Sequence, residues 1–321
     1  MKNRALLLLQ LLIAISLFVS PPAYADEEED EVFTATLTRY NYRIPDLTVV
    51  GEPSWCTVKP KDTLLDIARR YGLGYNEVDL LFPRMDAWIP PAGKRIAVPT
   101  FWVLPPTQHR QLVINVPELR IYFFDKSGNA VQTYPIGIGD EGWESPIGTF
   151  SITEKRPNPT WYIPASLQEK YGMAQMPPGP ENPLGEFMMK FSAGAYGVHG
   201  TAMPWGVGRL VSHGCIRCYP EHIRILYPQV PVGYKLEMIY EPIKFGQKNG
   251  QVFVEAHPDV YRKIPDYIQY GFDKLAQYPL EKQVDRKKFT MALTLQNGVP
   301  TNVTRLSPDD NSLKLVEFSQ E

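Results

Sequence analysis

The feature that most constrains the fold is a rhythm of short apolar runs separated by glycine and proline in the middle of the chain. Residues 112–116 and 119–124 flank Pro117-Glu118 as a tight hairpin, and the runs 131–138 and 149–153 continue the pattern. Apolar runs of this length that end at turn residues are typical of strands. The sequence therefore predicts a mainly β domain, built as a β-sandwich or a barrel. Thirty-one prolines and only 21% charged residues agree with many short strands and few long helices.

The N-terminus has the layout of a secretory signal peptide. Lys2 and Arg4 precede an apolar run over residues 5–19, and Ala23-Tyr24-Ala25 follows. We expect cleavage after Ala25, which places the protein in the periplasm or cell envelope. The apolar run is shorter than the roughly 20 residues of a membrane span, and no later segment is long enough either. An uncleaved N-terminal anchor is the alternative.

Charge and size limit the partners and the domain count. Loss of Lys2 and Arg4 changes the formal charge from −2 to −4, so the exported chain lacks the basic character of nucleic acid binding proteins. About 296 residues remain, more than one hydrophobic core usually holds, so two or three domains are expected. Residues 26–31 are all acidic, and we interpret 26–54 as a solvated leader. Residues 101–106 end in two prolines and are interpreted as a stiff connector.

Residues 55–99 predict a small unit of strand, helix, helix and strand. Thr63 is a helix cap with Asp66 at the third helical position, and a second short helix is expected from Asn76. Strands are expected at 55–59 and 96–99.

This order of elements, with Val58-Lys59-Pro60, Asp62-Thr63-Leu64 and Ile89-Pro90, resembles the LysM module. The resemblance implies binding to the glycan strands of peptidoglycan. Lys61 stands where that family usually has glycine, and Phe82-Pro83 replaces its Asn-Pro. A spacer that keeps the core and has lost its ligand is therefore the alternative.

The strand rhythm fails between residues 156 and 190. A helix is expected over 165–171, followed by Pro177-Pro178-Gly179-Pro180. A proline-rich excursion of this length inside a strand domain is typical of a functional loop or lid, and an irregular surface loop is the alternative. The C-terminal extension 241–321 predicts a strand pair around Gly250, a helix within 259–278 and a strand near 289–295, with no assigned chemistry.

Two histidines and two cysteines gather within residues 199–218. The chain reads His199-Gly200-Thr201 and, after a gap, Ser212-His213-Gly214-Cys215-Ile216-Arg217-Cys218. With Cys56 the cysteines number three, so at least one thiol is expected to be free. The cluster is compatible with acyl transfer, with redox exchange between Cys215 and Cys218, and with zinc binding by His199, His213 and both cysteines.

Acyl transfer requires a thiolate, and a nearby imidazole can supply it by taking the thiol proton. His199 and Cys215 come together if 194–199 and 211–215 are neighbouring strands, and His213 then shares a face with Cys215.

Glycines flank both groups. Gly214 would leave backbone N–H groups open to an oxyanion, and the Gly200 carbonyl would orient the imidazole.

The stretch from about Arg110 to Tyr240 resembles the L,D-transpeptidase catalytic domain. In that family a histidine lies about sixteen residues before the cysteine, as His199 does before Cys215. Other matching motifs are Gly137-Ile138-Gly139, Ser145-Pro146-Ile147-Gly148-Thr149-Phe150, Asn158-Pro159-Thr160-Trp161 and Pro178-Gly179-Pro180-Glu181-Asn182-Pro183-Leu184-Gly185.

The resemblance implies an enzyme that remodels peptidoglycan without a cofactor or metal. Its cysteine attacks the carbonyl between the L-centre of meso-diaminopimelate and the terminal D-alanine of a tetrapeptide stem, releases D-alanine and holds the stem as a thioester. An amine of another stem, or a lysine of a lipoprotein, then takes the acyl group. Residue by residue, Cys215 maps to the nucleophile, His199 to the general base and acid, Gly200 to its orienting group, His213 and Gly214 to the oxyanion region, and Ser212, Arg217, Trp161 and Asn182 to site-supporting or substrate-binding positions.

Several alternatives stay open. Water in place of the amine would give an L,D-carboxypeptidase or endopeptidase, and loss of the chemistry would leave a peptidoglycan-binding protein. Arg217 as a salt-bridge partner, His213 as a structural residue and Trp161 as a core residue are the ordinary readings of those side chains. Cys218 replaces the family's usual apolar residue, so it is either a small hydrophobe or a reversible disulfide partner of Cys215.

Overall fold

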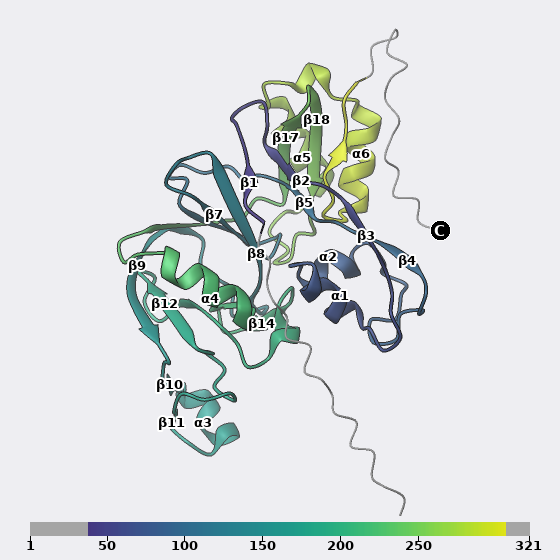
Figure 1. The fold of residues 1–321 in the computed structure, drawn as a ribbon. Coiled ribbons are helices and arrows are strands. Elements are labelled where there is room, and N and C mark those ends of the chain that lie inside the picture. The colour runs from purple at the N-terminus through teal and green to yellow at the C-terminus, as the bar shows by residue number, and fades with distance from the viewer. Residues whose placement is uncertain (1–37, 306–321) are drawn as a thin grey trace, which may run out of the picture. The chain divides into compact units, whose positions relative to one another are not determined.

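The structure is a computed structural model that describes residues 38–305 (Figure 1). These residues belong to one compact unit. The expected signal peptide, the acidic run 26–31 and the last part of the C-terminal extension lie outside the described residues. Within residues 38–305, no helix has the length and apolar character needed to cross a membrane.

The central element is a ten-stranded sheet in the order β1-β8-β15-β13-β12-β9-β16-β6-β7, with β14 paired to β8. A further pairing of β7 with β8 closes the order into a ring, so the strands form a barrel. The mainly β prediction is thus confirmed. The strands are β1 (Tyr40–Asn41), β6 (Leu112–Asn115), β7 (Arg120–Phe124), β8 (Ala130–Gly139), β9 (Gly148–Pro157), β12 (Phe187–Phe191), β13 (Gly197–His199), β14 (Leu210–Ser212), β15 (Ile216–Cys218) and β16 (Lys235–Ile239).

The predicted hairpin and the barrel core follow from the apolar runs. β6 and β7 pair antiparallel around the Pro117-Glu118 turn, as predicted. Ile114, Ile121, Ile138 and Val198 are fully buried in one apolar cluster. The helix α4 (Pro220–Gln229) contributes Ile223 and Leu226 to the same cluster, with η1 (Pro204–Gly206) preceding it in the chain.

The 55–99 unit has the predicted strand-helix-helix-strand order. β3 (Ser54–Thr57) pairs with β4 (Arg95–Val98), and α1 (Leu64–Arg70) and α2 (Tyr75–Asp79) lie between them in the chain. The Thr63 hydroxyl accepts from the Asp66 N–H at 3.0 Å, and the Asp66 carboxylate accepts from the Thr63 N–H at 2.9 Å, which completes the predicted capping box.

Lys61 has a φ of +70°, in the left-handed region that favours glycine. The turn before α1 therefore keeps its backbone shape without the glycine.

The solvated-leader interpretation of 26–54 is wrong for its described part. β1 pairs with β8, and β2 (Val49–Gly51) pairs with β5 (Phe101–Val103). The expected stiff connector is therefore a paired strand as well. The acidic residues that motivated the leader interpretation are confined to 26–31. The later residues include apolar side chains such as Val49 and Val50, which are 1% and 3% exposed and whose burial favours packing.

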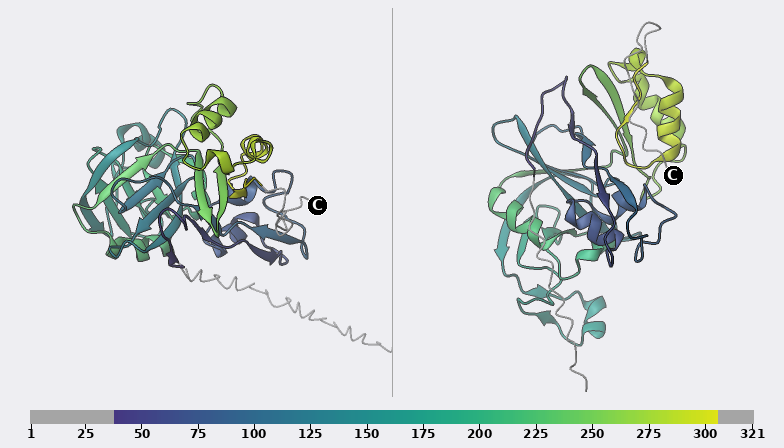
Figure 2. Two further views of the ribbon diagram at one scale, coloured as in Figure 1. Left: turned by 90° about the horizontal axis from the view of Figure 1, so that it is seen from above. Right: turned by 45° about the vertical axis from the view of Figure 1, so that its right-hand side comes forward.

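The C-terminal extension forms a three-stranded sheet with helices. β17 (Ile243–Lys248) and β18 (Gln251–Ala256) form the predicted pair, and β19 (Thr301–Asn302) pairs with β18 (Figure 2). Between β18 and β19 the chain forms α5 (Tyr267–Ala276), η2 (Glu281–Gln283) and α6 (Arg286–Leu295). The predicted strand near 289–295 is wrong, because this segment is α6.

Two local features explain this difference. The Asp285 carboxylate accepts from the N–H groups of Lys287 and Lys288 as a helix cap. Phe289, Ala292 and Leu293 are buried at helical spacing, which favours a helix over a strand.

The excursion between β9 and β12 contains a small projecting unit (Figure 1). β10 (Trp161–Tyr162) pairs with β11 (Gln175–Met176), and α3 (Ala165–Tyr171) lies between them as predicted.

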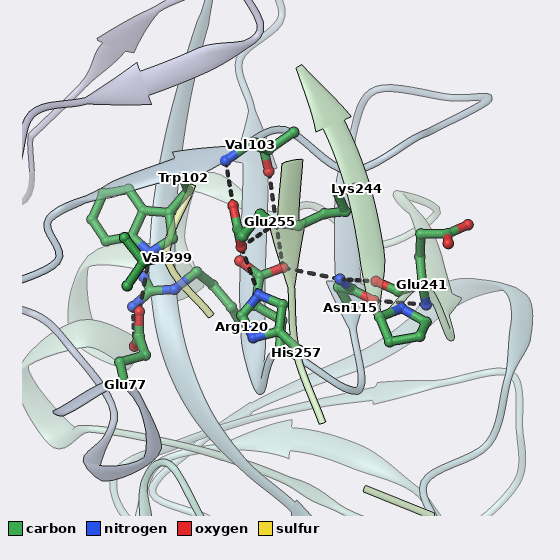
Figure 3. Close-up of polar contacts among 12 residues, drawn as sticks. Glu77, Trp102, Val103, Asn115, Arg120, Glu241, Lys244, Glu255, His257 and Val299 are labelled. Carbon is green, nitrogen blue, oxygen red and sulfur yellow. Dashed lines mark hydrogen bonds and ion pairs between the residues drawn. The ribbon is translucent and has the colours of Figure 1, made fainter. Parts of the chain in front are cut away.

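A buried charge cluster connects the extension to the rest of the chain (Figure 3). The Lys244 ammonium of β17 lies 2.8 Å from Glu118 Oε2 and 2.8 Å from Glu255 Oε1, and it donates to the Val103 carbonyl at 2.6 Å. His257 Nε2 lies 2.6 Å from Glu255 Oε1. The cluster thus joins β5, the turn between β6 and β7, and the C-terminal sheet, and Lys244 supplies the cation that its two carboxylates require.

Candidate active site

Parallel pairing of β13 with β15 brings the two motifs together. Val198 lies opposite Ile216, and His199 lies opposite Arg217. Val198 and Ile216 are buried in the barrel core, so His199 and Arg217 share the other face of the sheet. The expected pairing of 194–199 with 211–215 is wrong by a few residues, because β15 begins just after Cys215.

The two cysteines of Cys215-x-x-Cys218 have different surroundings. Cys218 is fully buried in the barrel core with Ile216, and burial raises its pKa to about 12. Cys215 is only partly buried, and the Arg217 charge acts on its thiol. Both thiols are free. Cys218 therefore acts as a small hydrophobe, and the geometry supports neither the redox nor the zinc interpretation.

The His199 ring is held in one tautomer. Its Nδ1 lies 2.6 Å from the Gly200 carbonyl, which can only accept, so Nδ1 carries the proton and Nε2 is a free base. Burial lowers the His199 pKa to about 4; the Gly200 carbonyl opposes this shift and the Arg217 charge adds to it. The imidazole is therefore neutral near pH 7 and able to accept a proton. The contact between Nδ1 and the Gly200 carbonyl has the geometry that the predicted orienting role of Gly200 requires.

The Cys215 thiol is protonated at rest. Burial raises its pKa, whereas a hydrogen bond from the Gly197 backbone and the Arg217 charge act in the opposite direction. Because the thiol does not ionise by itself near neutral pH, it needs a neutral base such as His199.

The turn at Gly214 sets the backbone beside the thiol. Gly214 has a φ of +96°, and a Cβ there would lie 2.3 Å from the Tyr196 ring. The Ser212 hydroxyl accepts from the Gly214 N–H at 3.1 Å and donates to the Cys215 carbonyl at 2.6 Å. Ser212 is thus a brace of the turn and not a substrate contact. Within residues 38–305 the Cys215 N–H donates no hydrogen bond, which makes it the open donor beside the thiol.

The predicted shared face of His213 and Cys215 is wrong. The positive φ of Gly214 breaks the alternation of an extended strand. His213 is exposed, and its ring packs edge-on against Trp143 with 4.6 Å between centroids.

Arg217 is a partly buried cation without a carboxylate partner in the described part of the chain. Its Nε has no hydrogen-bond partner, and Tyr171 of α3 is close enough to act on its charge. Trp161 packs edge-on against the same Tyr171, 5.0 Å between centroids. Arg217 therefore makes no salt bridge within the described residues. The projecting unit that contains Trp161 and Tyr171 lies on the side of the site where Arg217 is.

The substrate-binding prediction for Asn182 is wrong. Its amide is buried and donates to the carbonyls of Pro159 and Pro177 at 3.0 Å each, while its Oδ1 accepts from the Leu184 N–H at 2.9 Å. Asn182 holds the excursion together and has no free group for a ligand.

Comparisons with known proteins agree with this geometry. The model of the L,D-transpeptidase catalytic domain matches residues 109–238. The probable L,D-transpeptidase YcfS of Escherichia coli is 32% identical over 273 residues, which cover 80% of this chain and 85% of that protein. The chain belongs to the L,D-transpeptidase family. It is accordingly an enzyme of the peptidoglycan L,D-transpeptidase class.

Two further similarities are found, one to a relative and one to a solved structure. The probable L,D-transpeptidase ErfK/SrfK of Salmonella typhimurium is 30% identical over 279 residues, 81% of this chain and 89% of that protein. The solved catalytic domain of an L,D-transpeptidase from E. faecium aligns with 42% of this chain and 100% of that chain, at 18% identity and a TM-score of 0.34.

Sequence reasoning missed two groups next to the L,D-transpeptidase motif. Ser145 was noted only as part of a family motif, although its hydroxyl contacts the Gly214 carbonyl. Tyr261 lies beyond the matched catalytic domain, and its hydroxyl contacts the Gly139 carbonyl. Nothing in the local sequence marks Tyr261, because its partners are more than a hundred residues away.

Proposed function

We propose that Cys215 is the nucleophile of an L,D-transpeptidation on peptidoglycan tetrapeptide stems. The supporting observation is the neutral, oriented imidazole of His199 on the strand beside Cys215. His199 Nε2 takes the thiol proton as Sγ attacks the carbonyl between meso-diaminopimelate and D-alanine. The imidazolium then gives the proton to the leaving nitrogen, so D-alanine departs and a thioester remains.

Arg217 is proposed to bind an anionic group of the stem. It is a partly buried cation without a carboxylate partner, and a bound carboxylate satisfies such a group. Trp161 and Tyr171 of the projecting unit line the approach to it. A primary amine of another stem, or a lysine of a lipoprotein, is proposed to take the acyl group from the thioester.

The test is intact-mass and product analysis after incubation with a disaccharide tetrapeptide. Cys215→Ala is expected to abolish D-alanine release and the acyl adduct, while the matched variant Cys218→Ala keeps both. A cross-linked product supports transfer, and tripeptide as the sole product supports the hydrolytic alternative. Release of D-alanine by the Cys215 variant would refute the assignment of the nucleophile.

Residues 55–99 are proposed to form a LysM-like module that binds glycan strands. A groove of about 190 Å³ is lined by Thr63, Asp66 and Trp88 of this unit and by Pro204 and Trp205 of the barrel. Both tryptophans are exposed, 61% and 54%, and flat aromatic faces suit the apolar faces of sugar rings. Trp88→Ala is expected to lower the fraction of protein that sediments with insoluble peptidoglycan, without changing turnover of a soluble tetrapeptide. An unchanged sedimented fraction would support the alternative that the unit is a spacer.

Export is proposed from the N-terminal 25 residues, which have a basic start, an apolar run and a small-residue cleavage site. Periplasmic fractionation of the chain, and an N-terminus at Asp26 in the mature protein, are the expected results.

A further inference from the structure

A short segment of the C-terminal extension, residues 259–264, lies against the turn formed by residues 139–145. Lys263 Nζ lies 2.6 Å from a Glu144 carboxylate oxygen, and Arg262 pairs with Glu141 at 3.3 Å. The Tyr261 ring, just before these two residues in the chain, stacks on Tyr240 at an interplanar angle of 22°. The matched catalytic domain ends at residue 238, so this contact comes from outside it.

Tyr261 reaches the backbone of that turn with a buried hydroxyl. The hydroxyl donates to the Gly139 carbonyl at 2.8 Å and accepts from the Ser145 N–H at 3.2 Å. Tyr261 is 8% exposed and Ser145 is 2% exposed, so water does not compete for these hydrogen bonds. The Tyr261 hydroxyl therefore fixes the position of Ser145.

Ser145 in turn holds the peptide next to the nucleophile. Its hydroxyl accepts from the Gly139 N–H at 3.0 Å and donates to the Gly214 carbonyl at 3.1 Å. A trans peptide is planar, and its C=O and N–H point in opposite directions. Because the Gly214 carbonyl is held toward Ser145, the Cys215 N–H of the same peptide points away from Ser145.

We infer that Tyr261 is a positioning residue that acts through Ser145 to aim the Cys215 N–H at the oxyanion formed during acylation. The inference rests on Cys215 being the nucleophile. The nucleophile's own N–H is well placed for this role, because the oxyanion forms on the carbon that becomes bonded to the sulfur. The C-terminal extension therefore contributes a positioning residue, Tyr261, to the active site.

The experiment compares Tyr261→Phe with Tyr267→Phe in the full chain. The matched control also loses a partly buried hydroxyl of the extension, but the Tyr267 hydroxyl lies against the His257 and Pro242 carbonyls and has no contact with the site. D-alanine release is measured in a single turnover on the tetrapeptide. Cys215 alkylation by iodoacetamide is measured in parallel, because alkylation displaces iodide and forms no oxyanion.

Tyr261→Phe is expected to slow acylation about tenfold or more, with KM and the alkylation rate within about twofold of the wild type. Tyr267→Phe is expected to change neither rate. Ser145→Ala is expected to slow acylation at least as much, and the Tyr261→Phe/Ser145→Ala double variant should lose no more than Ser145→Ala alone.

Unchanged acylation in Tyr261→Phe would overturn the inference, and so would an equal fall in alkylation, which would indicate general disorder of the site. Additive losses in the double variant would also overturn it. A wild-type chain that is alkylated at Cys215 but never acylated by the tetrapeptide would instead refute the proposed function itself.

Discussion

At the scale of single residues, the site depends on which groups carry a proton before the reaction begins. Burial keeps the His199 imidazole neutral and the Cys215 thiol protonated, so the resting pair is uncharged. An uncharged pair costs less to hold in a buried site than an imidazolium and a thiolate do. In the proposed mechanism the thiolate therefore forms when substrate arrives, as the proton passes to Nε2.

A pH profile tests this resting state. The form of His199 that accepts a proton is the deprotonated one, which dominates above its pKa of about 4. We therefore expect kcat/KM for D-alanine release to stay level from pH 7 to about pH 5 and to fall only near pH 4, and not near the ordinary histidine value of about 6.5. Circular dichroism at each pH checks that the chain stays folded. An acidic limb centred near 6.5 would contradict the buried neutral imidazole.

At the scale of elements, the excursion between β9 and β12 is ordered by a buried side chain and not by strand pairing alone. The Asn182 side chain makes four hydrogen bonds to backbone groups of the loop around α3. The sequence motif that contains Asn182 points equally to ligand binding and to loop structure. Only its neighbours distinguish the two roles.

Asn182→Ala leaves the carbonyls of Pro159 and Pro177 and the Leu184 N–H without a partner. We expect a loss of about 1 to 3 kcal/mol in the free energy of unfolding and faster hydrogen exchange over residues 157–186. Gln229→Ala, which removes an exposed amide that donates to the Ile225 carbonyl, is the control and should change stability by less than about 0.5 kcal/mol. Full stability of the Asn182 variant with a raised KM would restore the substrate-binding role.

At the scale of the whole molecule, the extension and the barrel are joined by buried charges. Lys244 is fully buried between Glu118 and Glu255, and Tyr122 donates to Glu118 on the barrel side. Burial raises the Glu118 pKa, but the Lys244 ammonium, the His257 ring and hydrogen bonds from Lys244 and Tyr122 together outweigh this and keep it below its usual value, so Glu118 stays ionised. Two buried carboxylates therefore depend on one ammonium.

Lys244→Met removes that ammonium and keeps the side-chain length. We expect a loss of about 3 to 5 kcal/mol in the free energy of unfolding, because two carboxylates remain buried without a cation. Lys248→Met is the matched control, since its partner Glu52 is 76% exposed, and it should cost less than about 1 kcal/mol. Chemical denaturation measures both. Equal stability of the two variants would show that the cluster does not hold the parts together.

The features that could be predicted from the sequence are local ones. Residues close in the chain form the hairpin of β6 and β7, the capping box of α1 and the helix α3. The contact between the His199 ring and the Gly200 carbonyl is also local. The family motif adds the His199 to Cys215 interval. Each of these features involves few residues that are close in the chain, so it does not depend on the position of distant segments.

Only the tertiary structure decided which strand neighbours which and which polar groups remain free. The partner of β13 is β15, Ser212 and Asn182 are occupied by backbone groups, and α6 forms because its apolar face packs against the C-terminal sheet. Tyr261 reaches Gly139 across more than a hundred residues. Such contacts depend on the position of distant backbone, which no local pattern encodes, and this is why the residue proposed to aim the Cys215 N–H is absent from the motif.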